Sequence, residues 1–80
     1  MSNDDFRDRI EIDSEIHFGK PCVKGIRVPV SDVLELVEEG IPFQDITDDY
    51  FPKVTEEDIQ ACLRYAREVI EAEDIHLKAS

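Results

Sequence analysis

Cysteine, glycine, tryptophan and basic side chains are all scarce in this sequence of 80 residues, which holds two cysteines, three glycines and no tryptophan. Two cysteines cannot build the dense disulfide framework of small secreted domains, so we expect reduced thiols and a cytoplasmic chain. No apolar run is long enough to cross a bilayer, and no signal peptide opens the sequence. A membrane partner is therefore not expected.

The few glycines, cysteines and histidines also argue against enzyme chemistry. None of Gly19, Gly25 and Gly40 begins a phosphate-binding loop, a nucleophile elbow or a dinucleotide fingerprint. His17 and Cys22 do not have the spacing of paired zinc ligands, and the other cysteine and histidine stand alone. We expect no catalytic residue, no metal and no cofactor.

The two cysteines have different surroundings. Cys62 falls on the apolar face of a predicted helix, which favours a small buried thiol. Cys22 stands near Lys20 and Lys24, two cations that could lower its pKa, although the sequence places no base beside it. Packing in the core or a turn is the preferred interpretation of Cys22, and a reactive thiol is the alternative.

Charge is strongly one-sided, with 20 acidic against 9 basic residues and a formal net charge of -11. Such a chain repels phosphate backbones and favours a basic protein partner. The cations Lys20, Lys24 and Arg27 lie in residues 16–31, which hold no acid, whereas residues 32–50 hold seven acids and no base. This asymmetry suits a contact between copies, and a solvated acidic face is the alternative.

The first thirty residues predict a flexible arm followed by a small β-ribbon. Residues 1–8 are polar and without period, and residues 9–13 alternate polar and apolar side chains as a strand does. Turns are expected at residues 17–21 and 24–25, where glycine and proline cluster. Residues 26–30 predict a second strand at a sheet edge, where the missing N–H of Pro29 can face solvent.

Three helices are predicted next. Ser31 is expected to cap the first, and Gly40 to end it in a left-handed conformation. Pro42 is expected at the first position of a short second helix that stops before Pro52. Residues 55–58 resemble a capping box and open a third helix to about residue 74. Its predicted apolar face consists of Ile59, Cys62, Leu63, Ala66, Val69 and Ile70.

Together these elements predict one α+β domain, mainly α, over residues 9–74, with a tail at 75–80 that frays or, as the alternative, extends the helix. The β-ribbon precedes a tri-helical body of helix-turn-helix type, similar to homeodomain and winged-helix folds. Gln60, Arg64 and Arg67 flank the third helix, and the two arginines could meet phosphate or guanine. Because acids crowd the start of that helix, a tri-helical core without nucleic acid is the alternative.

Several segments carry a family likeness. They are Arg-Ile-Glu-Ile-Asp at 9–13, Gly-Lys-Pro-Cys-Val-Lys-Gly at 19–25, Arg-Val-Pro-Val at 27–30 and Asp-Ile-Gln-Ala-Cys-Leu-Arg-Tyr-Ala at 58–66. The sequence resembles the prokaryotic domain of unknown function 433 family over about residues 9–71. Two departures are Ile26, where the family usually has threonine, and Phe51, which enlarges the turn before the last helix.

The resemblance implies a small ribbon on a tri-helical body, often dimeric, encoded beside a PIN-like nuclease in proposed toxin and antitoxin pairs. Residues of this chain that match the family signature are Gly19, Lys20, Pro21, Gly25, Arg27 and Pro29. Turn geometry explains the glycines and prolines, whereas Lys20, Lys24 and Arg27 are expected to contact a partner or nucleic acid. The expected function is an antitoxin-like, non-enzymatic binding module. The alternatives are a stand-alone DNA-binding regulator and a purely structural homodimer.

Overall fold

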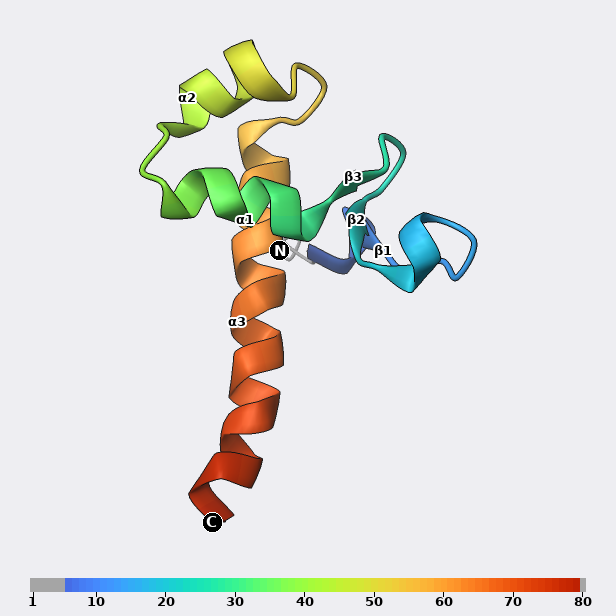
Figure 1. Ribbon diagram of the computed structural model, residues 1–80, viewed down its shortest axis with the longest axis vertical. Coiled ribbons are helices and arrows are strands. Elements are labelled where there is room, and N and C mark those ends of the chain that lie inside the picture. The colour runs from blue at the N-terminus through green and yellow to red at the C-terminus, as the bar shows by residue number, and fades with distance from the viewer. Residues whose placement is uncertain (1–5, 80) are drawn as a thin grey trace.

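A computed structural model describes the backbone of residues 6–79 and the side chains of residues 7–72 (Figure 1). The chain has an α+β fold that is mainly helical, as predicted. Its elements in chain order are η1 (Phe6–Asp8), β1 (Ile10–Glu11), η2 (His17–Gly19), β2 (Cys22–Val23), β3 (Val28–Pro29), α1 (Val30–Glu38), α2 (Phe43–Asp45), η3 (Ile46–Tyr50) and α3 (Glu56–Ala79).

The strands form a three-stranded antiparallel sheet in the order β1-β2-β3. Ile10 pairs with Val23, and Cys22 pairs with Pro29. The sequence predicted the two outer strands and an edge position for Pro29, both of which the structure confirms, but it missed β2. Both residues of β2 are buried, so this strand lacks the polar and apolar alternation that identified the others.

The first helix begins two residues earlier than predicted and without a side-chain cap. Pro29 occupies the N-cap position, and the Val30 amide donates to the Pro21 carbonyl oxygen at 2.9 Å. Ser31 therefore lies inside the helix, and the expectation that it caps the helix is wrong. The end of α1 is as predicted, because Gly40 has a φ of 85°.

Two hydrogen bonds close that end of α1. The Ile41 amide donates to the Leu36 carbonyl oxygen at 3.1 Å, and the Gly40 amide donates to that of Val37 at 3.0 Å. This pair of bonds is a Schellman motif, which satisfies carbonyls that the helix leaves free.

The second helix is short and divided. Pro42 is its N-cap residue rather than its first helical residue, α2 makes a single turn, and η3 continues it as a π-type turn that ends at Tyr50. The third helix then begins with the predicted capping box. The Asp58 amide donates to Oγ1 of Thr55 at 3.1 Å, and the Thr55 amide donates to Oδ2 of Asp58 at 3.0 Å.

The core lies where α1, the sheet and the first half of α3 meet. Its most deeply buried apolar side chains include Val23, Val33, Ile46, Val54, Ile59 and Cys62. On α3 the predicted apolar face is right for Ile59 and Cys62, whereas Leu63 and Ala66 are half-buried. Val69 and Ile70 are exposed, because the second half of α3 runs past the body of the domain (Figure 1).

The ends of the chain differ in part from the predicted arm and tail. Residues 6–8 of the predicted arm form η1, which contacts α3, while residues 1–5 lie outside the described residues. The backbone of the predicted tail is helical as far as Ala79. Among the described residues, no helix combines the length and the hydropathy needed to cross a membrane.

Candidate interaction surfaces

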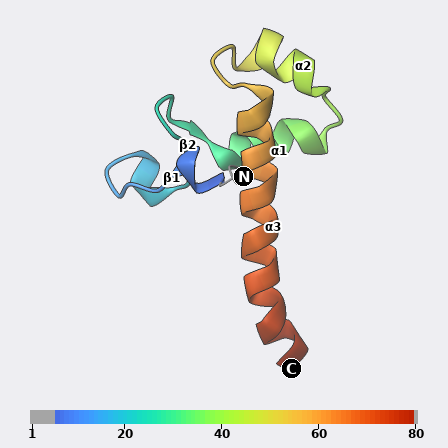
Figure 2. The same cartoon turned by 180° about the vertical axis from the view of Figure 1, so that it is seen from behind.

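Two turns of the β-region carry the three predicted contact cations. Residues 16–20 contain η2 and Lys20, and residues 24–27 connect β2 to β3 and contain Lys24 and Arg27. Nε2 of His17 lies 3.1 Å from the Arg27 carbonyl oxygen and joins the turns. Because that oxygen can only accept, Nε2 carries the proton. We call residues 16–27 the basic double turn, and it projects away from α3 in both views (Figures 1 and 2).

The cations of the basic double turn are available to a partner. Lys20, Lys24 and Arg27 are all exposed, and within the described part of the chain none of the three forms an ion pair. An exposed cation without a carboxylate partner keeps its full charge for an outside ligand.

The signature glycines and prolines have structural roles here. Gly19 and Gly25 have φ angles of 86° and 88°, a left-handed conformation that glycine adopts most readily. The Pro21 carbonyl accepts the hydrogen bond that starts α1, and Pro29 lies in the edge strand β3. Turn and edge geometry accounts for Gly19, Gly25 and Pro29, whereas Pro21 contributes a main-chain carbonyl that any residue would supply.

A second charged feature is the acidic segment of residues 32–50. All seven carboxylates of residues 32–50 are exposed, and no ion pair involves any of them among the residues whose side chains are described: Asp32, Glu35, Glu38, Glu39, Asp45, Asp48 and Asp49. We call this set the acidic face, and it spans α1, α2 and η3. Its unpaired charge of one sign favours a basic ligand.

The predicted nucleic-acid contacts on α3 are exposed but partly neutralised. Gln60 is exposed, Nε of Arg64 lies 3.2 Å from Oε2 of Glu68, and Nε of Arg67 lies 4.0 Å from Oε2 of Glu71. Both pairs have the i, i+4 spacing that brings opposite charges together on one side of a helix. A phosphate would have to displace these carboxylates.

Both thiols are protected. Burial raises the pKa of the Cys22 thiol above its ordinary value of 9.0, with further contributions from Glu11 and Asp32, and the thiol donates to the Lys20 carbonyl oxygen at 3.3 Å. The preferred interpretation of Cys22 as a packed thiol is therefore confirmed, and the alternative of a pKa lowered by the nearby lysines is not. Burial, assisted by Asp58, raises the pKa of Cys62 to about 12. Neither cysteine has the thiolate character of a nucleophile.

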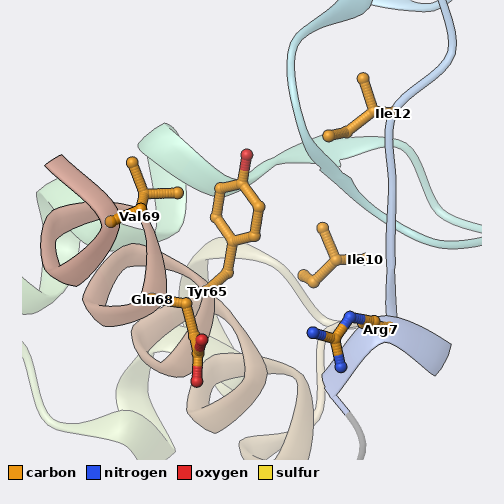
Figure 3. A pocket seen from close by; sticks show the side chains of 7 residues that line it. Arg7, Ile10, Ile12, Tyr65, Glu68 and Val69 are labelled. Carbon is orange, nitrogen blue, oxygen red and sulfur yellow. The ribbon is translucent and has the colours of Figure 1, made fainter.

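Sequence reasoning missed two apolar surface features. The Phe18 side chain is 98% exposed at the tip of η2. An apolar groove of about 440 Å³ runs between β1 and α3, with Ile10 and Ile12 on one wall and Tyr65 and Val69 on the other (Figure 3). The exposure of Phe18 could have been predicted from its position beside the turn glycine Gly19. The groove leaves no sequence signal, because its walls are 55 residues apart in sequence, from Ile10 to Tyr65.

Comparison with known proteins places the chain in a family. A family model described as "Protein of unknown function (DUF433)" matches residues 10–66. The chain belongs to the DUF433 family. The matched residues of this DUF433 chain include the sheet, the basic double turn, the acidic face and the first half of α3. Neither the curated proteins nor the solved structures contain a match.

Among the residues that the structure describes, no group of three metal-ligating side chains is close enough to hold an ion.

Proposed function

We propose that this DUF433 chain is a cytoplasmic, non-enzymatic, antitoxin-like module that acts as a homodimer and binds a PIN-like nuclease. The acidic face is the observation that carries the proposal. A nuclease must attract a phosphate backbone, so its substrate channel is basic, and seven unpaired carboxylates on α1, α2 and η3 can occupy such a channel in place of nucleic acid.

The charge arithmetic supports a protein partner over an anionic one. The net charge of -11 repels nucleic acid over the molecule as a whole, and the acidic face concentrates this charge over 19 residues, from 32 to 50. Electrostatic steering of this kind accelerates association and makes it sensitive to salt. The surrounding helices hold the carboxylates on a preformed surface, so little ordering entropy is lost on binding.

The test is co-purification with the small nuclease encoded beside the gene for this chain. We expect a complex at micromolar concentration and a loss of nuclease activity when the chain is added. The variant Asp48→Asn/Asp49→Asn should bind about tenfold more weakly, a change of roughly 1.4 kcal/mol. Failure of the two wild-type proteins to form a complex would overturn the proposal.

A matched control separates the acidic face from net charge. Glu15→Gln/Glu56→Gln removes the same two charges from exposed positions outside the face. We expect this control to bind the nuclease as the wild type does. Equal weakening by both double variants would show that net charge, and not the acidic face, attracts the nuclease.

A stand-alone DNA-binding regulator is the second candidate, favoured by the exposure of Gln60 and Arg64 on α3. It predicts salt-sensitive binding to the promoter of the chain's own gene, weakened by Arg64→Ala. A flat anisotropy titration with that promoter at low salt would reject it.

A further inference from the structure

Two exposed aromatic side chains lie in charged segments of opposite sign. Phe18 is 98% exposed in the basic double turn, and Tyr50 is 49% exposed at the end of η3. Tyr50 directly follows Asp48 and Asp49 of the acidic face. Exposed aromatic rings are favoured anchors of protein interfaces, because their burial removes a large apolar area from water. Each charged segment therefore carries an anchor that its own chain leaves largely in solvent.

The basic double turn holds its ring in a strained backbone. His17, Phe18 and Arg27 have φ angles of 51°, 59° and 60°, the left-handed region that a side chain with a Cβ disfavours. The Gly19 amide donates to the Ile16 carbonyl oxygen at 3.0 Å, and Nε2 of His17 donates to that of Arg27 at 3.1 Å. These bonds fix the turn in one arrangement, so little conformational entropy is lost when a partner binds it.

The basic double turn and the end of the acidic face do not meet within one chain. Among the residues whose side chains are described, Lys20, Lys24 and Arg27 form no ion pair. Asp48 and Asp49 form none there either. In both views the basic double turn lies beside α3, whereas α2 and the turn that follows it lie beyond the N-terminal end of that helix (Figures 1 and 2). Both sets of charges are thus left for another molecule.

We infer that the basic double turn of one chain binds the η3 end of the acidic face in a second copy. Phe18 packs against Tyr50, and the cations of the turn face Asp48 and Asp49. A two-fold dimer makes this contact twice, because each chain supplies one turn and one η3 end, and the assembly closes at two subunits. The inference gives an interface to the homodimer included in the proposed function, and it does not depend on the nuclease.

Charge favours this contact over others between copies. Two chains of charge -11 repel each other over most of their surfaces, so a stable contact brings a positive segment against a negative one. Residues 16–31 hold three cations and no acid, and residues 32–50 hold seven acids and no base. Carboxylates on α3 are poorer targets, because Glu68 and Glu71 already pair with Arg64 and Arg67.

The contact also affects the use of the acidic face. Asp48 and Asp49 belong to the face that the proposed function offers to a nuclease, so the nuclease and the second copy compete for these two carboxylates. This consequence rests on the proposed function. A chain whose basic double turn no longer binds a second copy should therefore bind the nuclease at least as tightly as the wild type.

An exchange of charge between two variants is the decisive test. Lys24→Glu/Arg27→Glu and Asp48→Lys/Asp49→Lys each place like charges across both contacts of the dimer. Each variant alone should therefore associate about tenfold or more weakly than the wild type in sedimentation equilibrium. A mixture of the two brings opposite charges together in both contacts, and it should associate about tenfold or more tightly than either variant alone.

Net charge is controlled with Arg64→Glu/Arg67→Glu. This variant changes the charge by the same amount as Lys24→Glu/Arg27→Glu, but on α3, outside both segments. It should weaken association less than the variant of the basic double turn does. Equal weakening by the two variants would show that overall repulsion, and not this contact, controls association, and would overturn the inference.

Phe18→Gly tests the aromatic anchor. Glycine relieves the positive φ of position 18, so the folded chain should resist thermal unfolding about as well as the wild type. Each buried ring accounts for roughly 10- to 100-fold in affinity, so loss of both rings should raise the dimer dissociation constant by about 100-fold or more. Tyr50→Ala should act in the same direction. Ile70→Ala is the matched control, because Ile70 is 66% exposed outside both segments, and it should leave association unchanged.

A wild-type chain that stays monomeric up to hundreds of micromolar would overturn the inference. A dimer that Phe18→Gly leaves unchanged, or a mixture of charge variants that associates no better than its components, would overturn it as well. Nuclease binding is measured separately with Lys24→Glu/Arg27→Glu, whose acidic face is intact. Loss of the dimer with retained nuclease binding would support both proposals, and a wild-type chain that dimerises without binding the nuclease would overturn only the proposed function.

Discussion

Replacing Asp58 by alanine should remove two stabilising interactions at once, the cap of α3 and the ion pair with Arg9. Asp58 is 7% exposed and uses both carboxylate oxygens. Oδ2 accepts from the Thr55 amide at 3.0 Å, which caps α3, and Oδ1 accepts from Nη1 of Arg9 at 3.0 Å, which ties the chain before β1 to that helix. Alanine removes both acceptors and leaves the Thr55 amide without its partner.

The expected loss is about 2 kcal/mol of unfolding free energy. The helix cap contributes about 1 kcal/mol. The contact with Arg9 contributes about 0.5 to 1 kcal/mol, since the arginine side chain is 43% exposed and water competes for it. A domain of 80 residues has roughly 4 to 12 kcal/mol in total, so this loss is a substantial fraction. The melting temperature should fall by about 10 °C.

Urea unfolding followed by circular dichroism at 222 nm measures this loss. Glu57→Ala is the matched control, because Glu57 also approaches Arg9, at 3.5 Å, but is 76% exposed and caps nothing. We expect the control to lose less than about 0.5 kcal/mol. Asp58→Asn keeps an acceptor for the Thr55 amide and should fall between the two. If Asp58→Ala lowered the unfolding free energy no more than Glu57→Ala does, the roles of Asp58 in capping α3 and in pairing with Arg9 would be refuted.

Three further outcomes test the packing. Ile59→Ala should cost about 2 to 5 kcal/mol in urea unfolding, against less than about 0.5 kcal/mol for the exposed Ile70→Ala; equal losses would contradict the assigned core. Gly40→Ala should cost about 1 kcal/mol through backbone strain alone, because nothing lies within 4 Å of an added Cβ, and Gly40→Asn should cost less. Cys62, with a pKa of about 12, should resist iodoacetamide at pH 8 until the chain unfolds, and rapid labelling of the native protein would show that the thiol is accessible. The contribution of this thiol to the unfolding free energy is complete below the ordinary thiol pKa of 9.0 and is lost as the pH rises toward 12.

Local chemistry was enough to predict several elements from the sequence. The end of α1 at Gly40 and the start of α3 at Thr55 depend on residues within a few positions of each other, and both were predicted correctly. The outer strands followed from alternation, and the exposure of Lys20 and Arg27 followed from their charge. Caps, turns and strand alternation depend on residues close together in sequence, so they can be predicted from the sequence alone.

Tertiary packing decided what local chemistry could not. β2 has no alternation because both of its residues are buried, and Ser31 lost its capping role because Val30 bonds to Pro21 across the sheet. The periodicity of α3 predicted an apolar face through Ile70, yet only its first half meets the body.

The sequence therefore determined the fold class, the end of α1, the start of α3 and the division of charge, all of which depend on composition and short-range pattern. Only the tertiary structure decided which apolar residues stay uncovered. Phe18 is fixed in solvent by a bond between His17 and Arg27, ten residues apart, and the groove exists only where β1 meets α3. A side chain's exposure depends on which distant segments pack on it, and sequence periodicity does not predict those segments.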